Sequence, residues 1–350
     1  MGIPDVGAGR LPKDRDFLET VEGLLFCVVD YLHPPGKYTA YLKYSPAEAG
    51  RWHRDGTAYH RELAYYHAHQ VGLTLDYLRE HYSTYVSFCP VRDMQFSLIP
   101  HDCVAAYYCP EERLAAVVQD PADALEEEVA ELAEALVAAT GLPLASFGLT
   151  GSILLGIHDP TFSDIDLTVY GRSAVARLRS VLAGPGIPGV GPVAADFEQA
   201  WRPEIVAHHG LTGGQVDWLV TRRWNFASYR GRRYLSLHPV RADAEIGERY
   251  GDHSYRDAGV CRLSAVVRSA VDAIFLPAIY EVQDVQIWEG PAVAVSQVVA
   301  YEGLFCQVAD PGQVIEARGK LERIDDGPSH RLVIGSSHRH GREYLLPADL

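Results

Sequence analysis

Two acids that flank one isoleucine are the residues of this sequence best suited to chemistry. Asp164 and Asp166 lie in "SDIDLTVY", residues 163–170, where alternating apolar residues predict a strand. Alternate side chains of a strand point to one side, so both carboxylates would face the same way. At about 4 Å and an effective dielectric constant of about 20, two such charges repel by about 4 kcal/mol. Solvent, an arginine or a cation must offset this repulsion, and carboxylate oxygens suit Mg²⁺.

A glycine and a serine precede these acids by a spacer of eleven residues. Gly151 and Ser152 follow "LASFGLT", which reads as a strand, and we expect a helix to start at "SILLGI". Glycine lets the backbone approach a bulky anion, and a helix N-terminus offers N–H groups to phosphate. The Ser152 hydroxyl can also donate. The stretch therefore predicts a phosphate site beside a metal site.

The combined stretch "TGSILLGIHDPTFSDIDLTVYG" resembles the signature of the DNA polymerase beta-type nucleotidyltransferase superfamily. That signature is Gly-Gly or Gly-Ser, a spacer of similar length, and then Asp-apolar-Asp or Asp-apolar-Glu. Ser163, before the first acid, also fits the common "SDID" form. The whole chain further resembles archaeal proteins described only as predicted nucleotidyltransferases, and "EGLLFCVVDYLHPPGKYTAYLKY" near its start supports this.

The resemblance implies a role for each matching residue. Asp164 and Asp166 would bind two Mg²⁺ or Mn²⁺ ions. Gly151 and Ser152 would hold the triphosphate of a nucleoside triphosphate such as ATP. Two metals about 3.5–4 Å apart would stabilise the attacking and leaving oxygens of an in-line displacement.

The resemblance also implies a third carboxylate, on a later strand, as a catalytic residue and metal ligand. Asp217 in "GGQVDWLVT" is the preferred residue, because it lies between apolar residues on what we expect to be a strand. Asp196 in "VAADFEQAW" is the rival, and Glu204 is the third candidate.

The function implied is transfer of a nucleoside monophosphate to a hydroxyl, with release of pyrophosphate. The acceptor stays open among RNA, a protein hydroxyl and a small molecule. The alternative is a non-catalytic nucleotide- or RNA-binding protein that retains the nucleotidyltransferase fold. The position of the third acid separates these two hypotheses.

The pattern of elements predicts an α+β protein with three parts. We expect an α+β amino-terminal region at 1–115 and a polymerase-beta-like nucleotidyltransferase domain, a mixed sheet with helices, at 116–254. Short alternating segments divided by Gly, Pro and Asp predict a small all-β barrel or sandwich at 255–350. An oligonucleotide-binding barrel is one form that this module could take.

One helix is predicted with particular clarity, from about 124 to 140. Apolar residues recur on one face, Asp123 can cap the start with Glu126 three positions later, and Gly141 can end the helix.

The composition limits the kinds of partner and the cellular location that we expect for this protein. The net charge of −15 argues against a surface that coats nucleic acid broadly, although a local basic groove is compatible with it. We expect no signal peptide and no membrane span, and therefore a cytoplasmic protein with reduced cysteines. The fifteen histidines show no HExxH or Cys/His zinc spacing, so we expect polar or half-buried histidines.

Arginines gather after the expected third strand. This cluster could hold a triphosphate or an acceptor backbone, or it could neutralise acids on an exposed face. Its members are Arg222, Arg223, Arg230, Arg232 and Arg233.

Overall fold

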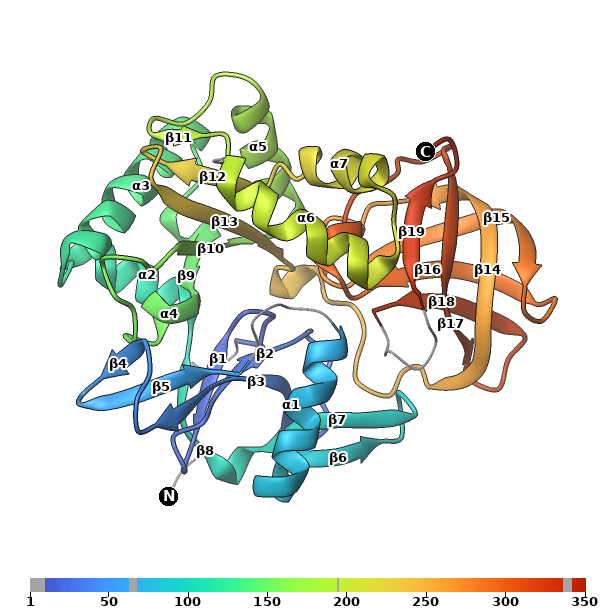
Figure 1. Cartoon of the computed structure of the whole chain (residues 1–350), viewed down its shortest axis with the longest axis horizontal. Helices are drawn as coiled ribbons and strands as arrows, with labels where there is room; N and C mark the ends of the chain where they lie inside the picture. The colour runs from blue at the N-terminus through green and yellow to red at the C-terminus, as the bar shows by residue number, and fades with distance from the viewer. Residues whose placement is uncertain (1–9, 63–67, 194, 336–341) are drawn as a thin grey trace. The chain divides into compact units, whose positions relative to one another are not determined.

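The computed structural model describes residues 10–62, 68–193, 195–335 and 342–350 (Figure 1). The fold is mixed α+β, as the sequence predicts, with α-helices and three β-sheets. The chain forms two compact units, each built from non-consecutive segments. Unit 1 comprises Met1–Leu63, Leu98–Phe197 and Trp224–Gly247, and unit 2 comprises Ala64–Ser97, Glu198–Arg223 and Glu248–Leu350. The expected domains at 1–115, 116–254 and 255–350 stay a prediction, and they divide the chain differently from these units.

The amino-terminal sheet of unit 1 is antiparallel. Its strands are β1 (Phe17–Thr20), β2 (Leu25–Val28), β3 (Lys37–Ala47), β4 (Trp52–Arg54), β5 (Thr57–Arg61) and β8 (Val104–Tyr108). Their order is β4-β5-β3-β2-β1-β8, and the last residues of β7 (Met94–Pro100) pair with β3. A Pro-Pro-Gly turn lies between β2 and β3.

The central sheet of unit 1 carries the motif. Its strands are β9 (Phe147–Thr150), β10 (Ile165–Tyr170), β11 (Val190–Gly191), β12 (Phe226–Tyr229) and β13 (Arg233–Val240). The order is β11-β12-β13-β10-β9, so β10 lies between β9, which is antiparallel to it, and β13, which is parallel. The helices of unit 1 are α2 (Pro110–Gln119), α3 (Ala124–Thr140), α4 (Gly151–Leu154) and α5 (Arg172–Ala183).

Helix α3 has the bounds that the sequence predicts. Asp123 caps it, since one carboxylate oxygen accepts from the amides of Leu125 and Glu126 at 2.8 and 3.0 Å. Gly141 follows in the left-handed region, with φ of 70°. The Glu126 side chain accepts from the amide of Ala122 rather than from that of Asp123, so the expected capping box is shifted by one residue.

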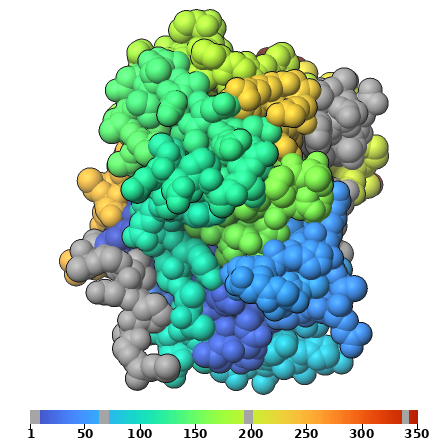
Figure 2. Space-filling model, turned by 90° about the vertical axis from the view of Figure 1, so that its left-hand side faces the viewer, coloured from blue at the N-terminus to red at the C-terminus, as the bar shows by residue number. Residues whose placement is uncertain are grey.

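The amino-terminal sheet packs on the motif itself. Phe17, Tyr44 and Tyr59 share one buried cluster with Leu155 and Ile157, which follow α4. Such a cluster removes apolar area from water at about 25 cal/mol per Å². In Figure 2 the lighter green surface of the segment after β9 lies directly above the blue surface of the amino-terminal strands, and the teal surface of α2 and α3 lies above it. This sheet is therefore part of the unit that holds the two acids.

Unit 2 contains a closed barrel. Its strands are β14 (Tyr255–Ser269), β15 (Ala278–Glu289), β16 (Ala294–Ala300), β17 (Val314–Ile324), β18 (Ser329–Ile334) and β19 (Tyr344–Pro347). The pairing runs β14-β15-β16-β18-β17 and returns to β14, while β19 pairs with β17. Five strands thus close into a ring, which agrees with the expected small barrel.

The remaining elements of unit 2 are largely helical. They are α1 (Ala68–His81), β6 (Val86–Cys89), most of β7, most of α6 (Ala195–His209) and α7 (Gly213–Thr221). Apolar residues of α6 and α7 share the buried core of the barrel. Among the residues that the structure describes, no helix is both long and apolar enough to cross a membrane.

The prediction that "GQVDWLVT" forms a strand is wrong, because these residues form α7. Thr212 and Gln215 make a reciprocal capping box, in which each side chain accepts from the backbone amide of the other residue. Val216, Leu219 and Val220 are buried at the three- and four-residue spacing of a helix face. In so short a segment the apolar pattern fits a strand as well, and the cap decides in favour of the helix.

Candidate metal and nucleotide site

Strand β10 carries the second acid of the motif, and the first acid lies just before it. Ile165 and Leu167 are fully buried, whereas the Asp166 side chain keeps 30% of its exposure. Asp164 immediately precedes the strand and is exposed. The apolar residues therefore face the core, and Asp166 lies on the opposite face of the sheet.

The Gly-Ser turn is held against the second acid. Gly151 begins α4 with φ of +72°, and a Cβ on it would lie 2.5 Å from Oδ2 of Asp166. Two features therefore require glycine at position 151: the positive φ of the backbone and the close approach of Asp166. Ser152 follows and is half-buried. Because α4 has only four residues, the amides of the turn matter here more than a helix dipole.

A serine and a histidine on β13 complete the surroundings of Asp166. Ser236 lies opposite Asp166 in the parallel register, and its hydroxyl donates to Oδ1 of Asp166. Nε2 of His238 lies 2.8 Å from Oγ of Ser236 and 3.8 Å from the same carboxylate oxygen. Since the Ser236 proton goes to Asp166, Nε2 of His238 carries the proton of the second hydrogen bond.

The sequence reasoning missed Ser236 and His238. Their signal is present in "YLSLHPV", where polar residues alternate with leucines on a strand. What the sequence lacks is the pairing of this strand with β10, which is not local.

The titratable groups of the site differ in charge. Desolvation raises the pKa of Asp164 to about 7, and the charge of Asp166 adds to the shift. Desolvation also acts on Asp166, but hydrogen bonds from its neighbours and the charge of Lys43 hold its pKa below the usual range. Burial and the charge of Arg15 lower the pKa of His238 to about 4. At pH 7, Asp166 is therefore ionised, His238 is neutral, and Asp164 is close to its midpoint.

Cations of unit 1 surround the acids. The charges of Arg61, Arg233 and Arg51 oppose the rise in the pKa of Asp164, and that of Lys43 acts on Asp166. Three of these four residues come from the amino-terminal sheet or its loops. In an acidic chain they form a local positive region that suits a triphosphate.

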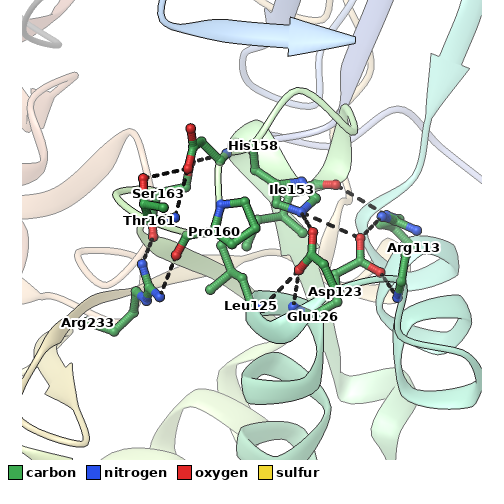
Figure 3. Close-up of polar contacts among 12 residues, drawn as sticks. Arg113, Asp123, Leu125, Glu126, Ile153, His158, Pro160, Thr161, Ser163 and Arg233 are labelled. Atoms are coloured by element: carbon green, nitrogen blue, oxygen red, sulfur yellow. Dashed lines mark hydrogen bonds and ion pairs between the residues drawn. The ribbon is translucent and has the colours of Figure 1, made fainter. Parts of the chain in front are cut away.

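Arg233 fastens the spacer between the two halves of the motif. Its guanidinium donates to the carbonyl oxygens of Ser163 and Pro160, at 2.9 Å each (Figure 3). The Ser163 hydroxyl in turn accepts from the amide of Asp159 at 3.0 Å. Because Ser163 precedes Asp164 directly, this clamp positions the first acid.

The other end of the spacer is tied to helix α3. Nε2 of His158 lies 2.8 Å from a carboxylate oxygen of Asp123, and Glu126 beside it binds Arg113 of α2 (Figure 3). A spacer held at both ends keeps the turn and the acids in one arrangement.

Two other arginines of the expected cluster pair with acids. Arg230 lies 2.6 Å from Glu131, and Arg232 lies 2.8 Å from Glu128. Of the cluster, Arg233 is the member that bears on the two acids of the motif.

The candidates for the third acid lie on helices. Asp217 is in α7 of unit 2, is exposed, and forms an ion pair with Arg202. Asp196 and Glu204 belong to α6, and the side chain of Asp196 lies outside the described residues. The described strands next to β10 carry no acid, and Ser236 lies opposite Asp166 instead. The expected strand position of Asp217 is therefore wrong, and its catalytic role stays a prediction.

The donor set fits a divalent cation of the Mg²⁺ or Mn²⁺ class. Asp166 lies against the glycine turn and Asp164 precedes Asp166 by two residues, and such cations take the rest of their ligands from water and phosphate. A second ion would need a further carboxylate.

The chain is similar along nearly its whole length to a protein named only as uncharacterized. It is 27% identical over 340 residues to Uncharacterized protein MJ1086 of Methanocaldococcus jannaschii, which covers 95% of this chain and 97% of that protein. No protein-family model matches the chain. No solved structure matches it either.

Proposed function

We propose that the protein is a cytoplasmic, metal-dependent nucleotidyltransferase that moves a nucleoside monophosphate from a nucleoside triphosphate to a hydroxyl acceptor. One observation carries the proposal: the glycine turn between β9 and α4 is held directly against Asp166 on the neighbouring strand. A phosphate bound by the turn would lie beside a carboxylate that can share its cation.

Each group has a role in this proposal. Asp164 and Asp166 hold the cation, while the Gly151 amide and the Ser152 hydroxyl bind the phosphates. A bound cation would neutralise the triphosphate and the leaving pyrophosphate. The neighbouring cations of unit 1 add to this neutralisation. Most of the rate enhancement would come from positioning the reactants and from stabilising charge in the transition state.

Ser236 orients Asp166 for this role. Its hydrogen bond adds to the effects of His238 and Lys43 that keep Asp166 ionised, and it turns one carboxylate oxygen toward β13. The other oxygen, Oδ2, faces Gly151. The carboxylate thus presents its free oxygen on the side of the glycine turn.

The acceptor is the open part of the proposal. RNA is one candidate, because a small closed barrel is an architecture that also occurs among oligonucleotide-binding proteins, which is an analogy of fold alone. A protein hydroxyl and a small molecule remain the others.

A labelling experiment tests the function. The protein is incubated with each α-labelled nucleoside triphosphate, Mg²⁺ or Mn²⁺, and cellular RNA, cellular protein or a small-molecule cell extract. We expect transfer of label with release of pyrophosphate, and its loss in Asp166→Asn. Nucleotide binding without any turnover for all four nucleotides and all three acceptor pools would overturn the enzymatic proposal.

A second candidate is a non-catalytic nucleotide- or RNA-binding protein. The observation that favours it is the serine opposite Asp166, where the enzymatic hypothesis expects a carboxylate on the adjacent strand. Tight, metal-dependent nucleotide binding with no product, unaffected by Asp217→Asn, is the result that this candidate predicts.

A further inference from the structure

Two histidines and a glutamate meet at the end of α6 in unit 2. His208 and His209 are the last residues of the helix, and Glu302 immediately precedes the short 3-10 helix Gly303–Phe305. Each of the three offers one ligand atom, and these atoms lie within 4.8 Å of one another. His209 and Glu302 are buried, with 2% and 4% of their exposure left. Ionisable residues at this depth require a partner of opposite charge or a metal ion.

The separations suit a tetrahedral ion. Nε2 of His209 lies 3.0 Å from one oxygen of Glu302, and Nε2 of His208 lies 3.6 Å from the other. Zinc bonds to nitrogen and carboxylate oxygen of about 2.0–2.1 Å place tetrahedral ligands about 3.3 Å apart. The two distances lie on either side of this value.

The ring of His209 is oriented by a contact of Nδ1, the ring nitrogen that does not face Glu302. Nδ1 lies 3.0 Å from the carbonyl oxygen of Glu343, which can only accept, so Nδ1 carries the proton. In the neutral ring the lone pair is then on Nε2, the atom that faces Glu302. A backbone carbonyl that fixes the tautomer in this way is the usual outer contact of a metal-bound histidine. Phe305 packs edge-on against the ring, with centroids 5.0 Å apart.

The position of Glu302 is constrained as well. A Cβ on Gly335 would lie 2.9 Å from Cγ of Glu302, so the backbone of Gly335 approaches the glutamate closely. The amide of Gly335 donates to Glu343 at 2.6 Å. Glu343 therefore contacts both sides of the cluster, the histidine through its backbone and Gly335 through its carboxylate.

A second group with similar ligands serves as a comparison. Asp123, Glu126 and His158 also lie close together, but the oxygens of both acids already bind groups of the chain. Asp123 accepts the amides that start α3, and Glu126 accepts from Arg113 and from the amide of Ala122. The helix cap and the ion pair therefore explain why Asp123, Glu126 and His158 lie together, without a metal ion.

We propose that His208, His209 and Glu302 bind one Zn²⁺ ion, with a fourth position for water or an outside ligand. Two imidazoles and one carboxylate are a donor set of zinc proteins with an open position. The ion joins the end of α6 to the segment that follows β16. All three ligands belong to unit 2, so this site is separate from the acids of the motif and does not depend on the proposed function.

Metal counting and cobalt spectroscopy test this site on the full chain, without a histidine tag. Mg²⁺ is kept in excess to occupy the acids of unit 1. We expect one Zn²⁺ per chain by mass spectrometry, and Co²⁺ in its place with the strong visible absorption of a tetrahedral ion. His208→Ala and Glu302→Gln should each weaken Zn²⁺ binding by more than about 100-fold. His208 is the more exposed histidine, so its variant is the one expected to stay folded, which circular dichroism verifies.

Two controls separate the site from other ligands. His158→Gln should bind Zn²⁺ as the original chain does, and so should Asp166→Asn. No stoichiometric Zn²⁺ in the original chain, or undiminished binding in folded His208→Ala and Glu302→Gln, would overturn the proposal. In that case the cluster is a buried ion pair between a protonated histidine and Glu302.

Discussion

A Cβ on Gly151 would lie 2.5 Å from Oδ2 of Asp166. No larger residue fits there unless the turn or the acid moves. This contact joins the two halves of the motif, which the sequence separates by eleven residues. It would also couple the proposed phosphate and metal sites, because one displacement would alter both.

Gly151→Ala should abolish metal-dependent nucleotide binding. The added methyl group meets Asp166, and φ of +72° strains any residue with a Cβ. Gly156→Ala is the matched control, since φ is +65° there but the nearest side-chain atom would be 3.9 Å away. Both variants should melt at a lower temperature, and Gly151→Ala alone should lose binding of a fluorescent nucleotide. Equal nucleotide affinity in the two variants would contradict the role of the turn.

Metal binding at the two acids should strengthen as pH rises from about 6 to about 8. The pKa of Asp164 is raised from 3.8 to about 7, so a proton competes with the cation below that value. Titration calorimetry with Mn²⁺ measures the affinity at each pH, and Asp164→Asn should remove most of the dependence. A Mn²⁺ affinity of the original chain that does not change with pH would contradict the raised pKa of Asp164.

The same shift has a consequence for stability. A carboxyl whose pKa is higher in the folded state binds more protons folded than unfolded between pH 4 and 7. The metal-free protein should therefore lose stability as pH rises through this window, and Mn²⁺ should reduce the loss. Because Asp164 is exposed, solvent screens the effect and the slope should be shallow. Urea denaturation at several pH values, with and without Mn²⁺, measures it.

Arg233→Ala should slow turnover more than it weakens nucleotide binding. It removes two hydrogen bonds to the spacer carbonyls, each worth about 1.5–3 kcal/mol when the donor is charged, and so releases Asp164. Arg232→Ala is the control, because Arg232 is 63% exposed and pairs only with Glu128 among the contacts seen. A tenfold or greater fall in kcat is expected for Arg233→Ala alone, since about 1.4 kcal/mol gives that factor. Identical kinetics of the two variants would rule out the clamp.

Ser236→Asp should bind Mn²⁺ more tightly than the original chain. The new carboxylate would lie opposite Asp166 in the register of β10 and β13. Without metal, the two like charges should lower the melting temperature. Ser236→Asn has the same shape without the charge, and it should show neither effect. Matching Mn²⁺ affinities in Ser236→Asp and Ser236→Asn would show that this position does not face the cation.

The sequence predicted the local parts of this structure well. Helix α3 has a cap, a long apolar face and a terminal glycine, and its bounds are as predicted. The mixed α+β class and the alternating strands of the barrel were also predictable, because their patterns are local. Helix α7 was predicted as a strand, since nine residues with scattered apolar positions fit both periods.

The sequence revealed the motif residues of the site but not the residues that tertiary structure brings to it. Asp164, Asp166 and Gly151 are close in sequence, and their spacing reveals them. Ser236 reaches Asp166 through a parallel strand pair, which no local pattern specifies. The cations of the amino-terminal sheet reach the acids only through tertiary packing, so the sequence did not indicate them.

The order of segments in unit 1 has a consequence for its assembly on the ribosome. The unit begins with residues near the amino terminus and is complete only with Trp224–Gly247, which contains β13. Asp166 therefore emerges long before Ser236 and His238 can contact it, and the acids cannot take their final arrangement in a nascent chain that stops short of β13. A fragment that ends at residue 223 would carry the whole motif and still lack one wall of the site. Because segments of unit 2 lie between those of unit 1 along the chain, no single cut separates the two units, and studies of the site should use the full chain.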